Sequence, residues 1–195
     1  MKIAPRDYVV PQGARVQLRR RPTRITPLYR DRDDYQALLE RHVAKMSRLQ
    51  DLLYASTQYA VLLIFQGMDT AGKDGVIRHV MRGVNPLGCQ AHSFRRPSAT
   101  EVLHDFLWRG VRDLPERGRL GLFNRSYYEE VVVVRVHPEL LLAQRFPEEA
   151  QKDKKIWPAR YRSIVNFENH LFRNGTRVVK FFLHLSRDEQ RKRLL

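Results

Sequence analysis

The feature that most constrains this chain is a glycine-rich turn that directly follows a short apolar run. Residues 60–65 read AVLLIF, and residues 67–75 read GMDTAGKDG. The run is short and rich in branched side chains, so we expect a strand buried on both faces. The turn fits the pattern G-x-x-x-x-G-K, and residues 73–84 can form the helix that should follow. A strand, a tight glycine turn and a helix in this order predict a phosphate-binding loop.

The residue types in this turn suit an anion. Glycines let successive backbone N–H groups face a phosphate, and the start of the following helix adds positive potential. Lys73 supplies a cation for the outer phosphate oxygens. The alternative is an ordinary glycine-rich turn between a strand and a helix. The candidate phosphate-binding loop comprises Gly67, Met68, Asp69, Thr70, Ala71, Gly72, Lys73, Asp74 and Gly75.

Two acidic residues of the turn depart from the usual pattern. Asp74 stands where a serine or threonine normally binds magnesium. Asp69 places a carboxylate among groups that attract anions, and a divalent cation would have to bridge it to a phosphate. Asp69 is therefore a candidate metal ligand, for Mg²⁺ or for Mn²⁺ in its place. The alternative is that Asp69 pairs with a neighbouring arginine.

A second group of candidate residues follows another short apolar run, residues 120–123. A phosphate-loop protein usually carries a carboxylate at the end of such a neighbouring strand, where it helps to hold magnesium. Here Asn124 takes that place and Arg125 follows it. An arginine at the carboxyl end of a strand would face the ligand crevice and could neutralise a phosphoryl group in flight. The alternative is that Arg125 is a plain surface residue.

The remaining segments alternate between helix and strand. Helical spacing covers residues 33–53 and 157–173, and Asn174-Gly175 should stop the second helix. Ser98 and Glu101 form a capping box that predicts a helix through residue 108, and Ser186 with Glu189 predicts another. Residues 127–136 are ambiguous, because four valines favour a strand and two early acids favour a helix. Further strands are expected at residues 89–94 and 177–185, which makes an α/β fold with a mostly parallel sheet.

The charge of the chain points to a polyanionic partner. Its 195 residues, enough for one sizeable domain, include 36 Lys and Arg against 21 Asp and Glu, a formal net charge of +15. The excess lies in residues 1–50 and 151–195. Residues 1–32 form a basic arm that prolines keep extended, and residues 33–195 form the main domain. One cysteine, no signal-peptide pattern and no apolar stretch of membrane-spanning length favour a cytoplasmic protein without a membrane partner.

Three long segments together resemble the polyphosphate kinase 2 family. They read FQGMDTAGKDGVIRHVMRGVNPLGCQAHSFRRPSATEVLHDFLWR, LGLFNRSYYEEVVVVRVHPE and WPARYRSIVNFENHLFRNGTRVVKFFLHLSRDEQRKRLL. The resemblance runs from about residue 33 to the end of the chain. It implies a P-loop three-layer α/β/α sandwich with a helical lid. The implied enzyme transfers a phosphoryl group reversibly between inorganic polyphosphate and a nucleotide, with Mg²⁺.

The resemblance also implies roles for individual residues. Asp69, Lys73 and Arg125 would be catalytic or phosphate-binding, and Asn124 and Glu129 would lie on the acceptor side. The motif NRSYYEE is similar to the class III subgroup, which accepts AMP and ADP and yields ATP. The lid would begin at about residues 186–195, with Arg193 as its arginine. The resemblance favours a helix, and not a strand, for residues 127–136.

Other expectations concern assembly, chain length and polyphosphate. Family members commonly form homo-oligomers and continue beyond the first lid helix, so we expect the lid and the C-terminal part of the fold to be incomplete at Leu195. Polyphosphate is a row of charges without bases or sugars, so a row of cations suffices to bind it. Candidates for that row are Arg78, Arg82, Arg95 and Arg96.

Two other functions remain open from the sequence. One is an ATP-dependent P-loop nucleotide kinase. Asp74 in place of the usual serine or threonine counts against it, as does a positive charge larger than one nucleotide needs. The other is a basic nucleic-acid-binding protein, which would explain the charge and leave the phosphate loop unused.

Overall fold

A central parallel sheet organises the protein. The computed structural model describes residues 8–145, 147, 149 and 155–195. Within them lie four strands, β1 (Ala60–Gly67), β2 (Cys89–Ser93), β3 (Leu120–Asn124) and β4 (Thr176–Leu183). Their order is β2-β3-β1-β4, and every pairing is parallel. The four expected strands and the parallel sheet are thus confirmed.

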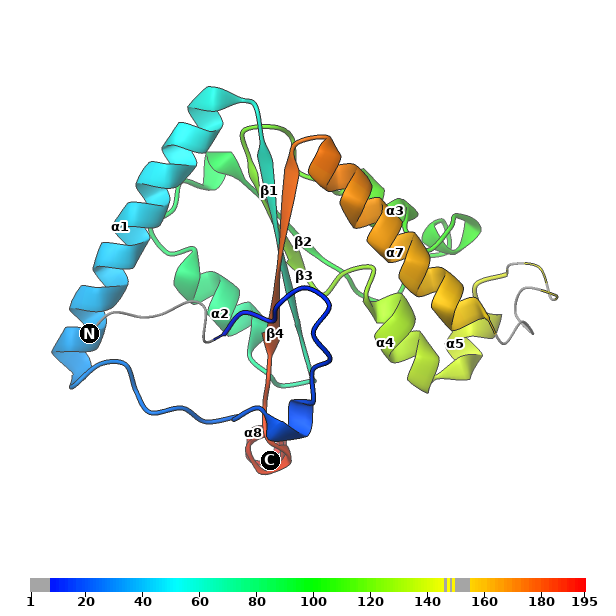
Figure 1. The fold of residues 1–195 in the computed structure, drawn as a ribbon, viewed down its shortest axis with the longest axis horizontal. Helices are drawn as coiled ribbons and strands as arrows, with labels where there is room; N and C mark the ends of the chain where they lie inside the picture. Colours follow the sequence, from blue (N-terminus) through cyan, green and yellow to red (C-terminus); the bar gives the residue numbers. More distant parts are fainter. Residues whose placement is uncertain (1–7, 146, 148, 150–154) are drawn as a thin grey trace.

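Helices cover both faces of this sheet (Figure 1). On one side lie α1 (Arg32–Ser56) and α2 (Lys73–Val80), and on the other lie α4 (Glu129–Val136), α5 (Pro138–Leu142) and α7 (Ile156–Arg173). α3 (Trp108–Arg112) belongs to the second side, and α8 (Arg187–Leu194) follows β4. Short 3-10 turns are η2 (Leu18–Arg20), η3 (Pro86–Gly88) and η4 (Glu101–Leu103). This is the expected three-layer α/β/α arrangement.

The ends of the helices follow local sequence signals. The Asp31 side chain accepts a hydrogen bond from the Asp34 backbone N–H at 2.8 Å and so caps the start of α1. Gly175, at φ +90°, ends α7 where the Asn-Gly pair was expected to stop it. The ambiguous valine-rich segment is helix α4, with Glu129 and Glu130 in its first turn. Those acids complement the helix dipole and outweigh the strand preference of the valines.

One expected helix is wrong in its extent. The Ser98–Glu101 capping box forms both of its hydrogen bonds, at 2.9 and 3.2 Å, but it opens only the three residues of η4. At His104 the backbone becomes extended. The Asp105 carboxylate then accepts from the Leu107 N–H at 2.9 Å and starts a separate turn that leads into α3. A second local cap therefore divides the segment that the sequence pattern joined.

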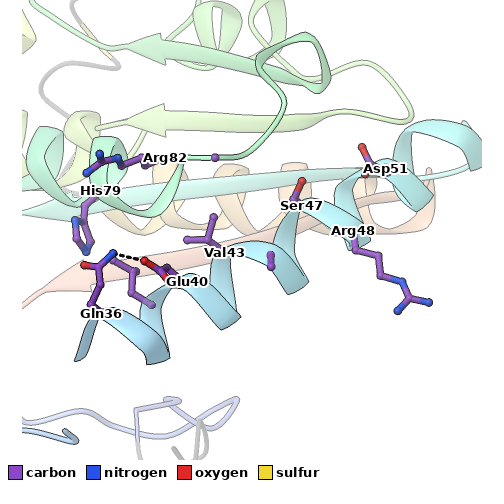
Figure 2. A pocket seen from close by; sticks show the side chains of 11 residues that line it. Gln36, Glu40, Val43, Ser47, Arg48, Asp51, His79 and Arg82 are labelled. Atoms are coloured by element: carbon purple, nitrogen blue, oxygen red, sulfur yellow. Dashed lines mark hydrogen bonds between the residues drawn. The ribbon is translucent and has the colours of Figure 1, made fainter. Parts of the chain in front are cut away.

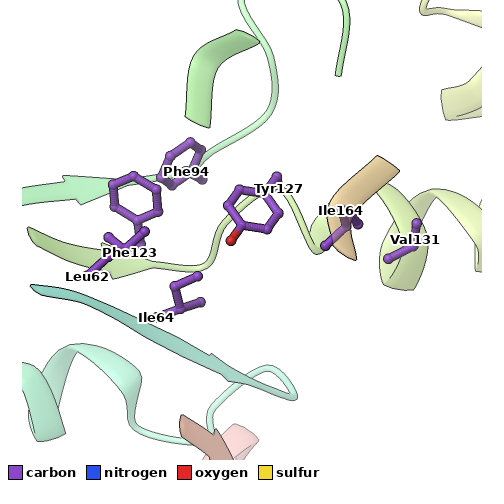
Figure 3. Packing of buried hydrophobic residues seen from close by; sticks show 7 residues of the cluster. All are labelled: Leu62, Ile64, Phe94, Phe123, Tyr127, Val131 and Ile164. Atoms are coloured by element: carbon purple, nitrogen blue, oxygen red, sulfur yellow. The ribbon is translucent and has the colours of Figure 1, made fainter. Parts of the chain in front are cut away.

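The main core lies between the sheet and the α4–α7 layer (Figure 3). Its buried members are Leu62, Ile64, Phe94, Phe123, Tyr127, Val131 and Ile164. The Phe94 and Phe123 rings meet edge to face with centroids 4.7 Å apart. Each large apolar side chain buried here stabilises the fold by about 1.5–3 kcal/mol. This core holds the end of β3 firmly against the helix that follows it.

The parallel sheet gathers four strand ends at one edge. β1 ends at Gly67, β2 at Ser93, β3 at Asn124 and β4 at Leu183, so the segments that follow them emerge on the same side of the sheet. Residues 8–27 are exposed and consist of turns, bends and irregular backbone around the 3-10 turn η2. In the part of the chain that the structure describes, no helix is long and apolar enough to cross a membrane.

Candidate active site

The phosphate-loop candidate is a tight turn between β1 and α2. The Ala71 N–H donates to the Met68 carbonyl at 3.1 Å, and Gly72 caps α2 at φ +87°, a backbone conformation that favours glycine. Thr70 adopts φ +61°, which is rare for a residue with a side chain. The turn therefore has the curled backbone that an anion-binding loop requires.

Lys73 lies inside this turn. Its Nζ donates to the carbonyl oxygens of Gly67 at 2.9 Å and Met68 at 3.0 Å, and the residue is 8% exposed. Burial, followed by the nearby Arg125 charge, lowers the pKa of the Lys73 ammonium below its usual range. The Lys73 ammonium thus contacts the backbone of its own loop at the start of α2, where the helix N-terminus attracts anions.

Arg125 reaches the same loop from the end of β3. Its backbone adopts φ +64°, and its N–H donates to the Phe65 carbonyl at 3.0 Å. Its guanidinium pairs with the Asp69 carboxylate at 2.8 Å and with Glu129 at 3.1 Å. Arg125 is therefore held over the phosphate loop and is not a plain surface residue. The pairing of Asp69 with a neighbouring arginine, which the sequence left open, is present here.

A third element, α8, closes over the turn. Its N-cap Ser186 accepts from the Glu189 N–H at 3.2 Å, as expected. The Arg193 guanidinium donates to the Thr70 carbonyl at 3.1 Å and also pairs with Glu189 at 2.8 Å. Gln190 donates to the Asp69 carbonyl at 3.1 Å. The residue expected to be the lid arginine therefore contacts the loop that the lid would cover.

Asn124 and Asp74 meet beside the turn. The Asn124 Nδ2 donates to the Asp74 Oδ1, which joins the end of β3 to the first turn of α2. Asn124 Oδ1 and Thr70 Oγ1 are both buried and have no hydrogen-bond partner within the described structure. Buried polar atoms are normally paired, and the described residues hold two further exceptions, Gln50 Oε1 and His184 Nδ1.

The four arginines expected to bind polyphosphate fall into two separate groups, and all four are exposed. Arg95 and Arg96 follow β2 at the edge that carries the loop. Arg78 lies in the last turn of α2 and Arg82 just beyond it. Arg82 lines a groove of about 690 Å³ between α1 and α2. Figure 2 shows Arg82 there with His79 and Glu40. The structure therefore does not bring the four together as one row.

Sequence reasoning missed two clusters of polar side chains, one buried around Glu130 and one partly exposed around Glu168. Glu130 accepts from Arg109 at 3.3 Å and lies 3.6 Å from Arg160, with all three side chains at most 7% exposed. Tyr128 and Lys180 both bond to Glu168, at 2.8 and 2.6 Å. These residues are far apart in the chain. The sequence signal for such clusters is a charged residue at a helix position where an apolar one is expected. That signal is weak.

Fold and site together define a P-loop protein of the kinase class: a parallel α/β sheet, a glycine turn with its lysine, and an arginine opposite that lysine. Residues 29–195 match the polyphosphate kinase 2 family. The chain belongs to this family, and the expected resemblance is confirmed.

Individual relatives agree with this assignment. The chain is 60% identical over all 195 residues to an ADP-polyphosphate phosphotransferase of Rhodopseudomonas palustris, of which it covers 68%. It is 47% identical over 150 residues, 77% of the chain, to an AMP/ADP-polyphosphate phosphotransferase of Meiothermus ruber, of which it covers 52%. The crystal structure of polyphosphate kinase 2 from Arthrobacter aurescens TC1 superimposes with a TM-score of 0.84 at 36% identity, over 98% of this chain and 65% of that one. The chain thus spans about half to two thirds of these relatives.

Proposed function

We propose that this protein transfers a phosphoryl group from inorganic polyphosphate to AMP or ADP, reversibly and with Mg²⁺. The observation that carries the proposal is the gathering of three cationic side chains, Lys73, Arg125 and Arg193, on a single glycine turn. The relatives named for ADP and for AMP/ADP support the substrate class. The net charge of +15 supports a donor more anionic than a single nucleotide.

The main obstacle to this reaction is charge repulsion. The acceptor is a nucleotide phosphate oxygen that is already ionised at neutral pH, so no general base is required. Two polyanions must instead be brought into contact. In this proposal Lys73 turns from the Gly67 and Met68 carbonyls to a phosphate oxygen, and Arg125 neutralises the moving phosphoryl group. Removing one such group typically costs about 10²–10³ in rate.

The residues present fit a hard divalent cation. Carboxylates of Asp69 and Asp74 and the orphaned Asn124 amide oxygen are the oxygen donors that Mg²⁺ prefers. No group of three or more acidic, histidine or cysteine side chains in the described ranges could hold a metal alone. That agrees with a cation held by one or two carboxylates together with substrate phosphates. When bound, it would offset phosphate charge and orient the two substrates.

A coupled assay tests the proposed function. The protein is incubated with polyphosphate, Mg²⁺ and either AMP or ADP, and luciferase measures ATP. We expect ATP to form although none is added. Lys73→Ala and Arg125→Ala should each lower the rate about 10²-fold or more, because each removes a cation facing the phosphates. The matched controls Lys45→Ala and Arg41→Ala change exposed cations of α1 and should keep the wild-type rate.

The same assay separates the rival functions. An ATP-dependent nucleotide kinase would make no ATP from polyphosphate and AMP, and any ATP that it formed from two ADP molecules would not depend on polyphosphate. A nucleic-acid-binding protein would bind oligonucleotides and give no luciferase signal with any donor. Wild-type turnover in both the Lys73→Ala and Arg125→Ala variants would overturn the assignment of the site.

We further propose that residues 186–195 act as the first part of a lid. The contacts of Arg193 with Thr70 and of Gln190 with Asp69 support this role, since they link α8 to the phosphate loop. Arg193→Ala should slow ATP formation. Arg191→Ala, which changes a neighbouring cation of the same helix, is its matched control.

A further inference from the structure

The turn that carries Arg125 is short and strained. It joins β3 to α4 through residues 125–128, and Arg125 adopts φ +64°, a region that disfavours a residue with a side chain. The ion pairs of Arg125 with Asp69 and Glu129 are open to water, because its side chain is 37% exposed, and such pairs hold a side chain weakly. One hydrogen bond, to the Phe65 carbonyl, fixes the start of the turn. The position of the guanidinium therefore depends on what fixes the end of the turn.

The end of this turn is tied to a single carboxylate of α7. The Tyr127 hydroxyl donates to Glu168 Oε1 at 3.0 Å, and the Tyr128 hydroxyl donates to the same oxygen at 2.8 Å. Lys180 of β4 donates to Glu168 Oε2 at 2.6 Å and to the Tyr128 hydroxyl at 3.0 Å. Hydrogen bonds to an ionised carboxylate are stronger than those between neutral groups. Glu168 thus joins the turn firmly to α7 and β4.

This cluster lies behind the turn, within the packing of the fold. Tyr127 is fully buried, and Figure 3 shows its ring between Phe123 of β3 and Ile164 of α7. An added Cβ at Gly110 would lie 2.9 Å from Cδ1 of this ring, so α3 packs directly against it. The Glu168 side chain is 16% exposed. The cluster can therefore influence the site through the backbone of the turn, without contact between Tyr127 and a substrate.

We propose that Glu168 is a positioning residue for Arg125. Its carboxylate holds Tyr127 and Tyr128, and the backbone of these two residues keeps Arg125 in its left-handed conformation over the phosphate loop. This rests on the proposed function, in which Arg125 neutralises the moving phosphoryl group. A small displacement of such a group slows a reaction strongly, because stabilisation of the transition state depends on geometry.

A double-mutant cycle tests the coupling between Glu168 and Arg125. Glu168→Gln keeps the size of the side chain and removes the charge that binds the two hydroxyls and Lys180. We expect it to lower kcat for ATP formation from polyphosphate and ADP about tenfold, with each KM within about twofold of wild type. In the Arg125→Ala background the same substitution should lower kcat by less than about twofold, because no arginine remains to be positioned.

The cycle also separates positioning from general support of the fold. A substitution that only loosened the fold would slow the Arg125→Ala variant as much as the wild type. Thermal unfolding shows that each variant is folded. The matched control Glu139→Gln removes a carboxylate from an exposed pair of α5 and should leave kcat and both KM values unchanged in either background.

Tyr128→Phe keeps the test decisive if Glu168→Gln does not fold. It removes one hydroxyl from the cluster and leaves the carboxylate in place. It should lower kcat about threefold in the wild type and have no effect in the Arg125→Ala background. Its control is Tyr161→Phe, which removes a hydroxyl that accepts from Arg135 in an exposed pair.

The NMR signal of the Arg125 Nε–H provides a measurement that needs no turnover. Its absence from Arg125→Ala identifies the signal, and its heteronuclear NOE reports motion of the side chain on the ps–ns timescale. Glu168→Gln should lower this NOE towards that of an exposed arginine such as Arg41, and Glu139→Gln should leave it unchanged.

Failure of this inference and failure of the proposed function are distinguishable. The inference is overturned if Glu168→Gln keeps the wild-type kcat, if it slows both backgrounds equally, or if the Arg125 side chain stays as rigid as in the wild type. If the wild-type protein makes no ATP from polyphosphate, the proposed function is wrong, and the NMR comparison alone decides whether Glu168 positions Arg125.

Discussion

At the scale of single residues, two unusual backbone conformations lie at the site. Thr70 and Arg125 both have positive φ, and both belong to the segments that meet over the phosphate loop. Holding a residue with a side chain in this region costs about 1–3 kcal/mol, which the surrounding fold must offset. For Arg125 the hydrogen bond from its N–H to Phe65 and the two ion pairs of its side chain provide part of that offset.

Two glycines of the loop should respond to alanine in opposite directions. Gly72 has φ +87°, so Gly72→Ala should lower the free energy of unfolding by about 1–2 kcal/mol. Gly75 has ordinary helical φ and nothing within 4 Å of an added Cβ. Gly75→Ala should therefore raise that free energy by about 0.5–1 kcal/mol. Urea denaturation measures both, and equal effects would show that backbone strain at Gly72 is not what selects glycine.

At the scale of elements, the buried carboxylate Glu130 joins three helices. Arg109 of α3 and Arg160 of α7 both reach Glu130 of α4, and Arg109 also donates to the Arg95 carbonyl at 2.8 Å. The segment after β2 is thereby tied to the layer behind the active site. Because all three side chains are buried, the network holds the three helices together and does not contact solvent.

Removing this carboxylate should be severe. Glu130→Ala leaves two buried guanidinium groups without their shared partner, so the free energy of unfolding should fall by about 3–5 kcal/mol. The control Glu139→Ala, in an exposed pair of α5 with His137, should change it by less than about 0.5 kcal/mol. Chemical denaturation compares the two, and a similar small loss in both would contradict the network.

The Tyr128 phenol should make the protein sensitive to alkali. Burial, together with the Glu168 carboxylate, raises the pKa of Tyr128 to about 12 from the ordinary value of 10. Between these values the unfolded chain loses the proton first, so stability should fall as pH rises from 10 to about 12. Tyr128→Phe should make this decline shallower, as measured by urea denaturation at pH 9, 10 and 11. Tyr8→Phe, in the exposed arm, should leave the decline unchanged.

The elements that sequence predicted well are those with local causes. The strand 60–65 and the Asn-Gly stop of α7 follow from burial pattern and turn chemistry within a few residues. The extent of the helix after Ser98 was wrong because Asp105 starts a competing turn. The Glu130 and Glu168 clusters were missed because their partners lie 12–52 residues away, and no local pattern signals such pairing.

The site shows the same division. The loop, its lysine and Arg125 followed from one motif and one strand end. The pairing of Arg125 with Asp69 depends on the register of β1 against β3. The contact of Asp74 with Asn124 depends on that register and on the course of α2. Those are properties of the assembled sheet.

At the scale of the whole molecule, the positive charge should govern donor binding. A long polyanion contacts many cations, whereas ADP contacts few, so salt should screen donor binding more strongly. We expect the KM for polyphosphate to rise more steeply with NaCl between 50 and 300 mM than the KM for ADP. Steady-state ATP formation measures both, and parallel slopes would contradict a spread-out donor site.

The parallel sheet also gives the molecule two edges that carry different segments. Every strand delivers its following segment to the edge that holds the phosphate loop, Arg125 and α8. The opposite edge carries connections such as the turns at Gly118 and Gly175. If the enzyme were tethered to a solid support through this opposite edge, the edge with the phosphate loop would face solvent. Polyphosphate could then approach the loop freely.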